Sequence, residues 1–184
     1  MSLTEETIQS EQVYDGDLLK VFRDDVRLPD GGSSHREWVN HPGAAAVVPL
    51  FDDGTTILVR QFRYPPRRSF LELPAGKFDE NGEAAESVAG RELEEETGWK
   101  AETLVHLGES FPCIGYSNEV IHFFLATDLT EGRQELGTAE FLDVVRMPLE
   151  EAFRMMDNGE LYDMKTTTGL QMVRRHLERN ESAI

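Results

Sequence analysis

The first forty residues of the chain contain two segments in which polar and apolar residues alternate. They lie at residues 18–28 and 35–40, and Pro-Asp-Gly-Gly at residues 29–32 separates them. Alternation predicts half-buried strands, and a proline- and glycine-rich turn between two strands indicates a β-hairpin. Residues 1 to about 12 are polar and acidic without this period, so we expect them to be frayed or disordered.

Apolar and alternating segments later in the chain predict further strands. We expect them at residues 43–50, 55–63, 71–76, 101–110, 120–126 and 141–147. The short 71–76 segment ends in a predicted turn. Pro148 opens a predicted helix that ends at Gly159, and a last helix is expected over residues 165–180. Strands mixed with a few helices predict an α/β or α+β sandwich.

Composition narrows the class of protein and of partner. A length of 184 residues fits one domain, or a compact domain with an appendage, and 39% apolar residues suffice for a packed core. The 35 acidic residues against 18 basic ones give a net charge of −17, which argues against nucleic acids and anionic membrane surfaces as partners. A small anionic substrate must therefore arrive with a metal ion or meet a local basic patch.

The cysteine content and the N-terminus bear on the compartment. Cys113 is the one cysteine of the sequence, so no intrachain disulfide can form. The acidic N-terminal segment does not resemble a signal peptide, and no apolar run approaches the length of a membrane span. We therefore expect a reducing, cytoplasmic location.

The most informative segment, residues 76–99, carries three glutamates close together. Glu92, Glu95 and Glu96 stand at i, i+3 and i+4, so on a helix they share one face within about one turn. Such crowding of like charge is unfavourable unless a cation lies among the carboxylates, and Mg²⁺ prefers a few carboxylates together with substrate phosphates. The alternative interpretation is a solvated acidic helix face.

The residues around these glutamates indicate a helix anchored on its other side. Ala85, Ala89 and Leu93 form an apolar stripe at i, i+4 and i+8. Glu83 lies near the helix start, where a carboxylate favours the helix dipole, and Gly98 stands where a C-terminal cap belongs. The segment therefore predicts a strand, a glycine loop and a helix that is acidic on one side and apolar on the other.

This segment resembles the Nudix box, in which Gly, Glu, Arg-Glu, Glu-Glu and Gly recur at fixed spacings along a loop and a helix. The matching residues are Gly76, Glu83, Arg91, Glu92, Leu93, Glu95, Glu96, Gly98 and Trp99. Six residues instead of five separate Gly76 from Glu83, and Trp99 replaces the usual aliphatic residue. Both departures lie outside the expected metal-binding carboxylates.

Segments outside the box resemble the ADP-ribose pyrophosphatase branch of this family, over residues 13 to 170. They include HPGAAAVVPL, VRQFRYPPRRSFLELPAG, GYSNEVIHFFLA and MKTTTGL. The resemblance implies an α/β/α sandwich with a mixed sheet, preceded by an N-terminal antiparallel β extension. We accordingly divide the chain into an extension at residues 1–42, which in this branch builds a homodimer, and a Nudix hydrolase domain at residues 43–184.

The resemblance also implies a metal-dependent hydrolase of a diphosphate bond, with Mg²⁺, or alternatively Mn²⁺, as cofactor. Glu92 and Glu96 match the principal metal ligands and catalytic carboxylates. Glu95 matches an additional or water-mediated ligand, and the backbone carbonyl of Ala75 matches a further one, which would explain a tight glycine turn. The structural residues of the box are then Gly76, Glu83, Arg91 and Gly98. We expect an ion pair between Glu83 and Arg91.

A general base must come from elsewhere, because the box glutamates are occupied by metal. In this branch it is a carboxylate on a loop before a late strand, which here spans residues 133–144. Glu140 matches best, as base or as metal ligand, and Glu135 is the alternative. Thr138 stands where some relatives carry a carboxylate and cannot serve. A plain surface glutamate is the structural alternative for Glu140.

Substrate contacts are expected from arginines and from positions that the resemblance supplies. Four arginines crowd one short segment, Arg60, Arg63, Arg67 and Arg68. A guanidinium suits phosphate oxygens, and Arg63 is the predicted contact, although pairing with acidic surface groups would explain any single one. Relatives bind the nucleotide or terminal sugar, sometimes across a dimer, at the positions of Arg36, Glu37, Glu72 and Glu119.

The implied substrate is a nucleoside diphosphate sugar, with ADP-ribose preferred and AMP and ribose 5-phosphate as products. Many ADP-ribose hydrolases carry Ser-Pro-Gly where this chain has Cys113, Ile114 and Gly115. A broad nucleoside diphosphate sugar hydrolase therefore stays an alternative. Two further alternatives are a house-cleaning nucleoside triphosphate pyrophosphatase and a non-catalytic nucleotide-sugar sensor. The N-terminal hairpin argues against the first, and the complete set of box glutamates argues against the second.

Overall fold

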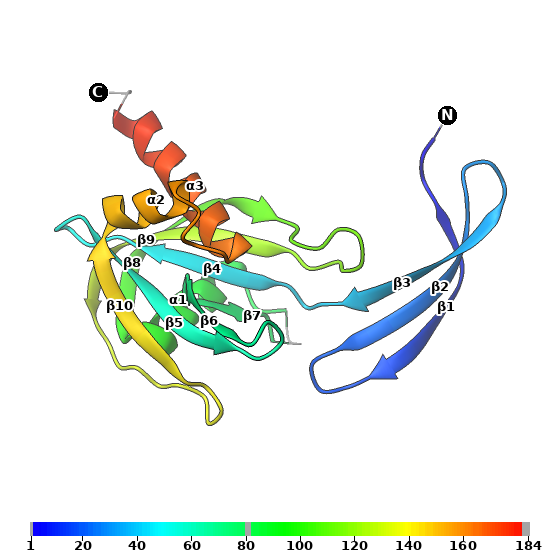
Figure 1. Cartoon of the computed structure of the whole chain (residues 1–184), viewed down its shortest axis with the longest axis horizontal. Coiled ribbons are helices and arrows are strands. Elements are labelled where there is room, and N and C mark those ends of the chain that lie inside the picture. Colours follow the sequence, from blue (N-terminus) through cyan, green and yellow to red (C-terminus); the bar gives the residue numbers. More distant parts are fainter. Residues whose placement is uncertain (1, 80–81, 182–184) are drawn as a thin grey trace. The chain divides into compact units, whose positions relative to one another are not determined.

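The chain forms two compact units in the computed structural model, which describes residues 2–79 and 82–181 (Figure 1). One unit combines Met1–Gly43 with Phe111–Val120, and the other combines Ala44–Ser110 with Ile121–Ile184. Two box-loop residues, 80 and 81, lie outside the described residues. Each unit is described by itself below.

The first unit is built on a three-stranded antiparallel sheet. Its strands, in sheet order, are β1 (Glu6–Asp15), β2 (Lys20–Arg27) and β3 (Ser33–Asn40). The amide of Leu28 donates a 2.8 Å hydrogen bond to the carbonyl of Gly32, which closes the turn between β2 and β3. Gly31 has φ 88°, a conformation that glycine adopts without strain. The predicted hairpin is confirmed.

The expectation of disorder at residues 1–12 is wrong from Glu6 onward. β1 pairs with β2 from Glu6 opposite Arg27 to Asp15 opposite Lys20. Every residue of β1 is exposed, so neither face of the strand needs apolar side chains and the sequence shows no alternation. Backbone pairing holds the strand, together with a 2.6 Å hydrogen bond from Ser10 Oγ to Asp24.

The second unit contains a mixed four-stranded sheet and a three-stranded antiparallel sheet. The first has the order β7 (Ala75–Lys77), β4 (Ala44–Pro49), β9 (Ile121–Glu131) and β8 (Trp99–Ser110). The second has the order β10 (Leu142–Pro148), β5 (Thr55–Arg63) and β6 (Arg68–Glu72). β4 and β9 run parallel and all other neighbours run antiparallel, so the predicted mixed sheet is confirmed.

Helices cover both faces of the mixed sheet. They are α1 (Ala85–Thr97), α2 (Leu149–Asp157) and α3 (Met164–Glu181). On β4, Ala45 and Val47 belong to the cluster that contains the apolar face of α1. Ala46 and Val48 belong to the opposite cluster, which contains the buried residues of α2 and α3. A strand buried on both faces is apolar at every position, which explains the continuous run in the sequence and confirms the α/β/α sandwich.

The segment before the box differs from its prediction. The strand β6 ends at Glu72, Leu73 and Pro74 form the link, and β7 begins at Ala75. Gly76 pairs with Ala45 of β4, so it lies in a strand and the turn predicted there is wrong. Pro74 interrupts the ladder because it has no N–H to donate. Among the residues that the structure describes, none of the helices is long and apolar enough to span a membrane.

Candidate active site

The strand β7 and the helix α1 meet at Gly76 and Glu92. A Cβ atom added at Gly76 would lie 2.0 Å from the carboxyl carbon of Glu92. Any side chain at position 76 would therefore displace this carboxylate. The glycine of the box is required by a close approach and not by a turn.

Glu96, one helical turn after Glu92, is the buried carboxylate of the site. It is 7% exposed, and its Oε2 atom accepts a 3.2 Å hydrogen bond from the backbone N–H of Ala75. Burial and the charges of Glu92 and Glu140 raise the pKa of Glu96 to about 8, against the opposing Ala75 hydrogen bond. Burial also raises the pKa of Glu92, although Arg91 acts in the opposite direction. The two carboxylates are thus incompletely neutralised by the chain itself.

Arg91 supplies a cation to the other box glutamates. Its Nη1 atom donates to Glu92 Oε1 at 2.7 Å and to Glu95 Oε2 at 3.2 Å, and its Nη2 atom donates to Glu83 Oε2 at 3.3 Å. The structure therefore contains the ion pair expected between Glu83 and Arg91. The guanidinium also relieves part of the crowding that, from the sequence, seemed to require a metal ion.

The box carboxylates supply only part of the ligands that a hard divalent cation needs. Across residues 2–79 and 82–181, no group of three or more His, Cys, Asp or Glu side chains is arranged to hold a metal ion. Arg91 engages one oxygen each of Glu92 and Glu95, and Glu96 has no arginine bonded to it. Mg²⁺ characteristically takes one or two carboxylates and completes its shell with water and phosphate oxygens. Glu92 and Glu96 match that requirement.

The loop between β9 and β10 is fastened to the C-terminal end of α1. The amide of Gly132 donates to Gly98 O at 2.8 Å, and the amide of Glu135 donates to Glu95 O at 3.0 Å. The side-chain amide of Gln134 donates to Glu96 O at 2.7 Å. These bonds satisfy carbonyls that a helix end leaves without partners.

Gly98 has two reasons to be glycine. It ends α1 in the left-handed conformation, with φ 78°, and its N–H donates to Glu94 O at 2.8 Å, as the predicted cap requires. A Cβ atom there would also lie 3.3 Å from the backbone nitrogen of Gln134. Gly98 therefore leaves room for the backbone of the β9–β10 loop and also ends the helix.

The two candidate bases, Glu140 and Glu135, have different surroundings. The charge of Glu140 contributes to the raised pKa of both Glu92 and Glu96, so this carboxylate lies near the two box glutamates. Its Oε2 atom accepts a 3.1 Å hydrogen bond from the amide of Gly137 across a tight turn that includes Thr138. Glu135 and Glu140 are both exposed, and Glu135 lies 3.3 Å from Arg133. Of the two, Glu140 is the one whose charge acts on both Glu92 and Glu96.

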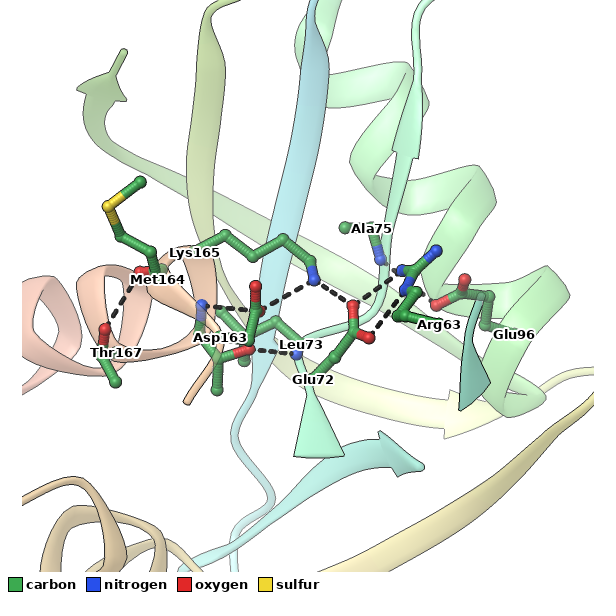
Figure 2. A network of polar contacts seen from close by, with 10 residues as sticks. Arg63, Glu72, Leu73, Ala75, Glu96, Asp163, Met164, Lys165 and Thr167 are labelled. Carbon is green, nitrogen blue, oxygen red and sulfur yellow. Dashed lines mark hydrogen bonds and ion pairs between the residues drawn. The ribbon is translucent and has the colours of Figure 1, made fainter. Parts of the chain in front are cut away.

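Arg63 and Glu72 form a bidentate ion pair beside this site (Figure 2). Both hydrogen bonds, from Nε and Nη2 of Arg63, measure 2.7 Å. Glu72 is 2% exposed and also binds the ammonium of Lys165. Burial alone would raise the pKa of Glu72, but the Arg63 and Lys165 interactions prevail and lower it. The side chain of Arg63 is 45% exposed, so Arg63, and not Glu72, is the member of the pair that is accessible from solvent.

The remaining predicted substrate residues lie in the first unit. Arg36 on β3 is bonded to Glu5, and Glu37 is exposed opposite Arg23 of β2. Glu119 lies 3.7 Å from His41 Nδ1. The sequence prediction missed Lys165 and Gln134, which are tied to predicted site residues. The MKTTTGL segment was the one signal for Lys165, and nothing marked Gln134.

Comparisons with known proteins agree with this geometry. The NUDIX domain family matches residues 40–166, and the family described as the nucleoside diphosphate sugar hydrolase N-terminal domain matches residues 5–39. The chain is 43% identical over 172 residues to an ADP-ribose pyrophosphatase of Bacillus subtilis, covering 92% of each chain. It is 39% identical over 169 residues to a methanol dehydrogenase activator of Bacillus methanolicus, covering 91% of each. A solved structure of an ADP compounds hydrolase matches with a TM-score of 0.85 at 25% identity, covering 98% of both chains.

Proposed function

The chain belongs to the Nudix family, and from this premise we propose that it hydrolyses the diphosphate bond of nucleoside diphosphate sugars. ADP-ribose is the preferred substrate, and AMP and ribose 5-phosphate are the products. The observation that carries the proposal is the meeting of Glu92, Glu96 and Ala75, where two carboxylates with raised pKa values face the start of β7. The ADP-ribose pyrophosphatase among the relatives and the match of both family domains support the substrate class.

Mg²⁺ is the proposed cofactor, and Mn²⁺ is the alternative ion for the same site. Glu92 and Glu96 would hold the ion, with Glu95 and the carbonyl of Ala75 as additional ligands. A divalent ion at this position supplies positive charge to the diphosphate oxygens. Binding also removes the unfavourable repulsion within the buried pair, because a cation stabilises both ionised carboxylates.

Glu140 is the proposed general base. Water attacks one phosphorus atom of the diphosphate, the bridging P–O bond breaks, and the released phosphate oxygen keeps the electron pair. Glu140 accepts the proton of the attacking water, and the effect of its charge on both Glu92 and Glu96, which requires it to lie near them, supports this role. The loop that carries it is fastened to α1 through Gln134 and Glu135.

Arg63 is the proposed phosphate contact, and Glu72 orients it. A guanidinium held through two bonds to a buried carboxylate is fixed in place before substrate arrives, which lowers the entropy lost on binding. Arg36, Glu37 and Glu119 are the proposed contacts to the nucleotide or terminal sugar. We further propose that the chain acts as a homodimer, which sedimentation at working concentration tests directly.

A panel of substrates tests the activity. Phosphate release, coupled to a phosphatase, is measured for ADP-ribose, ADP-glucose, UDP-glucose, GDP-mannose and 8-oxo-dGTP, with Mg²⁺ and with a chelator. Preference for ADP-ribose that depends on Mg²⁺ is expected. Equal rates over the sugars would indicate a broad hydrolase. Ile114 would then not confer the ADP-ribose preference that is associated with proline at this position in other ADP-ribose hydrolases. Turnover of the triphosphate alone would contradict the proposal.

A further inference from the structure

The helix α3 holds the link between β6 and β7. The backbone amide of Leu73 donates a 2.9 Å hydrogen bond to Thr166 Oγ1, and both residues are buried. One turn later, a Cβ atom at Gly169 would lie 2.4 Å from Leu73 Cδ1 and 3.1 Å from Phe123 Cδ1. The helix backbone thus touches Leu73 directly while its threonine binds the same residue. These contacts explain two positions of the MKTTTGL segment.

The Thr166 hydroxyl has a fixed orientation. It donates a 2.6 Å hydrogen bond to Asp163 Oδ2, which also accepts from the amide of Thr166 at 3.1 Å and from Lys165 at 2.8 Å (Figure 2). A hydroxyl has a single hydrogen, so its bond to Asp163 leaves only lone pairs for other partners. Asp163 therefore makes Thr166 an acceptor for the amide of Leu73.

Each polar backbone contact along the link comes from a different element. Leu73 N is bound by α3, and Pro74 O accepts a 3.0 Å hydrogen bond from Val47 N of β4. Ala75 N is bound by Glu96 of α1. Pro74 has no N–H and a restricted φ angle, so displacement at Leu73 is passed on to Ala75. Thr166 binds the first residue of the link, directly after Glu72, which ends β6 and pairs with Val59 of β5.

We propose that Thr166 is a positioning residue of the metal site and that Asp163 orients it. By fixing Leu73, the threonine sets the place of Ala75, whose N–H holds Glu96 and whose carbonyl is a proposed ligand. The inference rests on the proposed function for the identity of these ligands. It gives α3 a role in the active site, where the sequence predicted only a helix over residues 165–180.

Metal binding without substrate tests the inference. Mn²⁺ binding is measured by calorimetry for wild type, Thr166→Val, which keeps the shape and removes the hydroxyl, and Thr166→Ser, which restores the hydroxyl. Thr167→Val is the matched control, because the Thr167 hydroxyl donates to the Met164 carbonyl within the first turn of α3 and not to the link. Thr166→Val should weaken Mn²⁺ binding about tenfold or more, whereas Thr166→Ser and Thr167→Val should stay within about twofold of wild type.

The possible outcomes separate this inference from the proposed function. A folded Thr166→Val protein with wild-type Mn²⁺ affinity and wild-type Mg²⁺ dependence of hydrolysis would overturn the positioning role. If circular dichroism shows that this variant does not fold, Asp163→Ala replaces it, with Asp163→Asn as its conservative control, and unchanged affinity again overturns the inference. Wild-type protein that binds Mn²⁺ but cleaves none of the diphosphate sugars would contradict the proposed function alone.

Discussion

The backbone N–H of Ala75 donates a 3.2 Å hydrogen bond to Oε2 of Glu96, and this bond joins β7 to α1 at the buried carboxylate. The residue that the box predicts as a carbonyl ligand therefore also orients the carboxylate ligand. A shift of either element would move two proposed ligands together. We therefore expect the site to depend on contacts that hold β7 as well as on the glutamates.

Glu96→Gln should abolish most of the activity and leave the fold intact. The amide keeps the size of the side chain but loses the charge that attracts a cation, so kcat for ADP-ribose should fall by roughly two to three orders of magnitude or more. Steady-state kinetics at saturating Mg²⁺ and circular dichroism measure the two properties. Glu86→Gln, an exposed glutamate in the first turn of the same helix, is the control and should retain wild-type kinetics. Equal turnover in both variants would refute the assignment of Glu96 to the metal.

The same substitution should change how the stability of the metal-free protein depends on pH. The pKa of Glu96 is about 8 in the folded protein, above the ordinary 4.5, so the folded state binds this proton more tightly than the unfolded state. The associated stability is complete below pH 4.5 and is lost as pH rises through 8.

Glu96→Gln has no such proton to lose. At pH 9 it should be more stable than wild type by up to about 5 kcal/mol, since one pKa unit corresponds to about 1.4 kcal/mol over the interval from 4.5 to about 8. At pH 4.5 the two proteins should differ little. Denaturant unfolding in a chelator at both pH values gives the comparison, and Mg²⁺ should reduce the difference at pH 9. A constant gap at both pH values would show that Glu96 does not titrate in this range.

Gln134→Leu should lower kcat with little effect on metal affinity. The substitution removes the 2.7 Å hydrogen bond to Glu96 O and loosens the loop that leads to Glu140. Because misplacement of a catalytic group by about 1 Å can reduce a rate by up to a hundredfold, a loss of roughly tenfold is expected. Arg133→Ala removes the neighbouring, exposed side chain and should leave kcat unchanged. A loss of Mn²⁺ affinity equal to the loss of kcat would show that the substitution disturbs the metal-binding glutamates of α1 and not the loop.

The architecture could be predicted from the sequence wherever burial imposes a regular pattern of apolar residues. β4 is apolar at each position because helices cover both of its faces, and the Gly31 turn fixes the hairpin. β1 escaped prediction because all its residues are exposed, and backbone pairing with β2 does not depend on which side chains the strand carries. Its few apolar residues, Ile8, Val13 and Tyr14, do not alternate with polar ones, so the strand leaves no pattern to detect.

The site could be predicted only as far as local spacing reaches. The shared face of Glu92, Glu95 and Glu96 follows from a helical repeat. The binding of Arg91 by Glu92 and Glu95 depends on side-chain rotamers. The bond from Gln134 to Glu96 spans 38 positions, and the bond from Leu73 to Thr166 spans 93. Contacts between such distant positions arise from the packing of whole elements, so one sequence without its fold does not specify them.

Trp99 departs from the aliphatic residue usual in the box, and its contacts explain the departure. Its ring meets Phe51 edge to face with centroids 4.8 Å apart, and the guanidinium of Arg146 lies 3.7 Å from the Phe51 ring centroid. An edge-to-face pair contributes about 0.5–1.5 kcal/mol beyond the area it buries. The tryptophan, the first residue of β8, therefore stabilises the packing of this strand against Phe51 and Arg146 of β10.

Trp99→Leu, which restores the usual type of residue, should consequently destabilise this protein. A loss of about 1–3 kcal/mol in the free energy of unfolding is expected from the missing ring contacts and the smaller volume. Trp99→Phe, which keeps an aromatic edge, should lose less. Urea unfolding measures both, and Mn²⁺ affinity at a temperature where all variants are folded should equal that of wild type. Weaker metal binding in Trp99→Leu would mean that the aromatic packing at the end of α1 also sets the position of Glu96, three residues earlier in the chain.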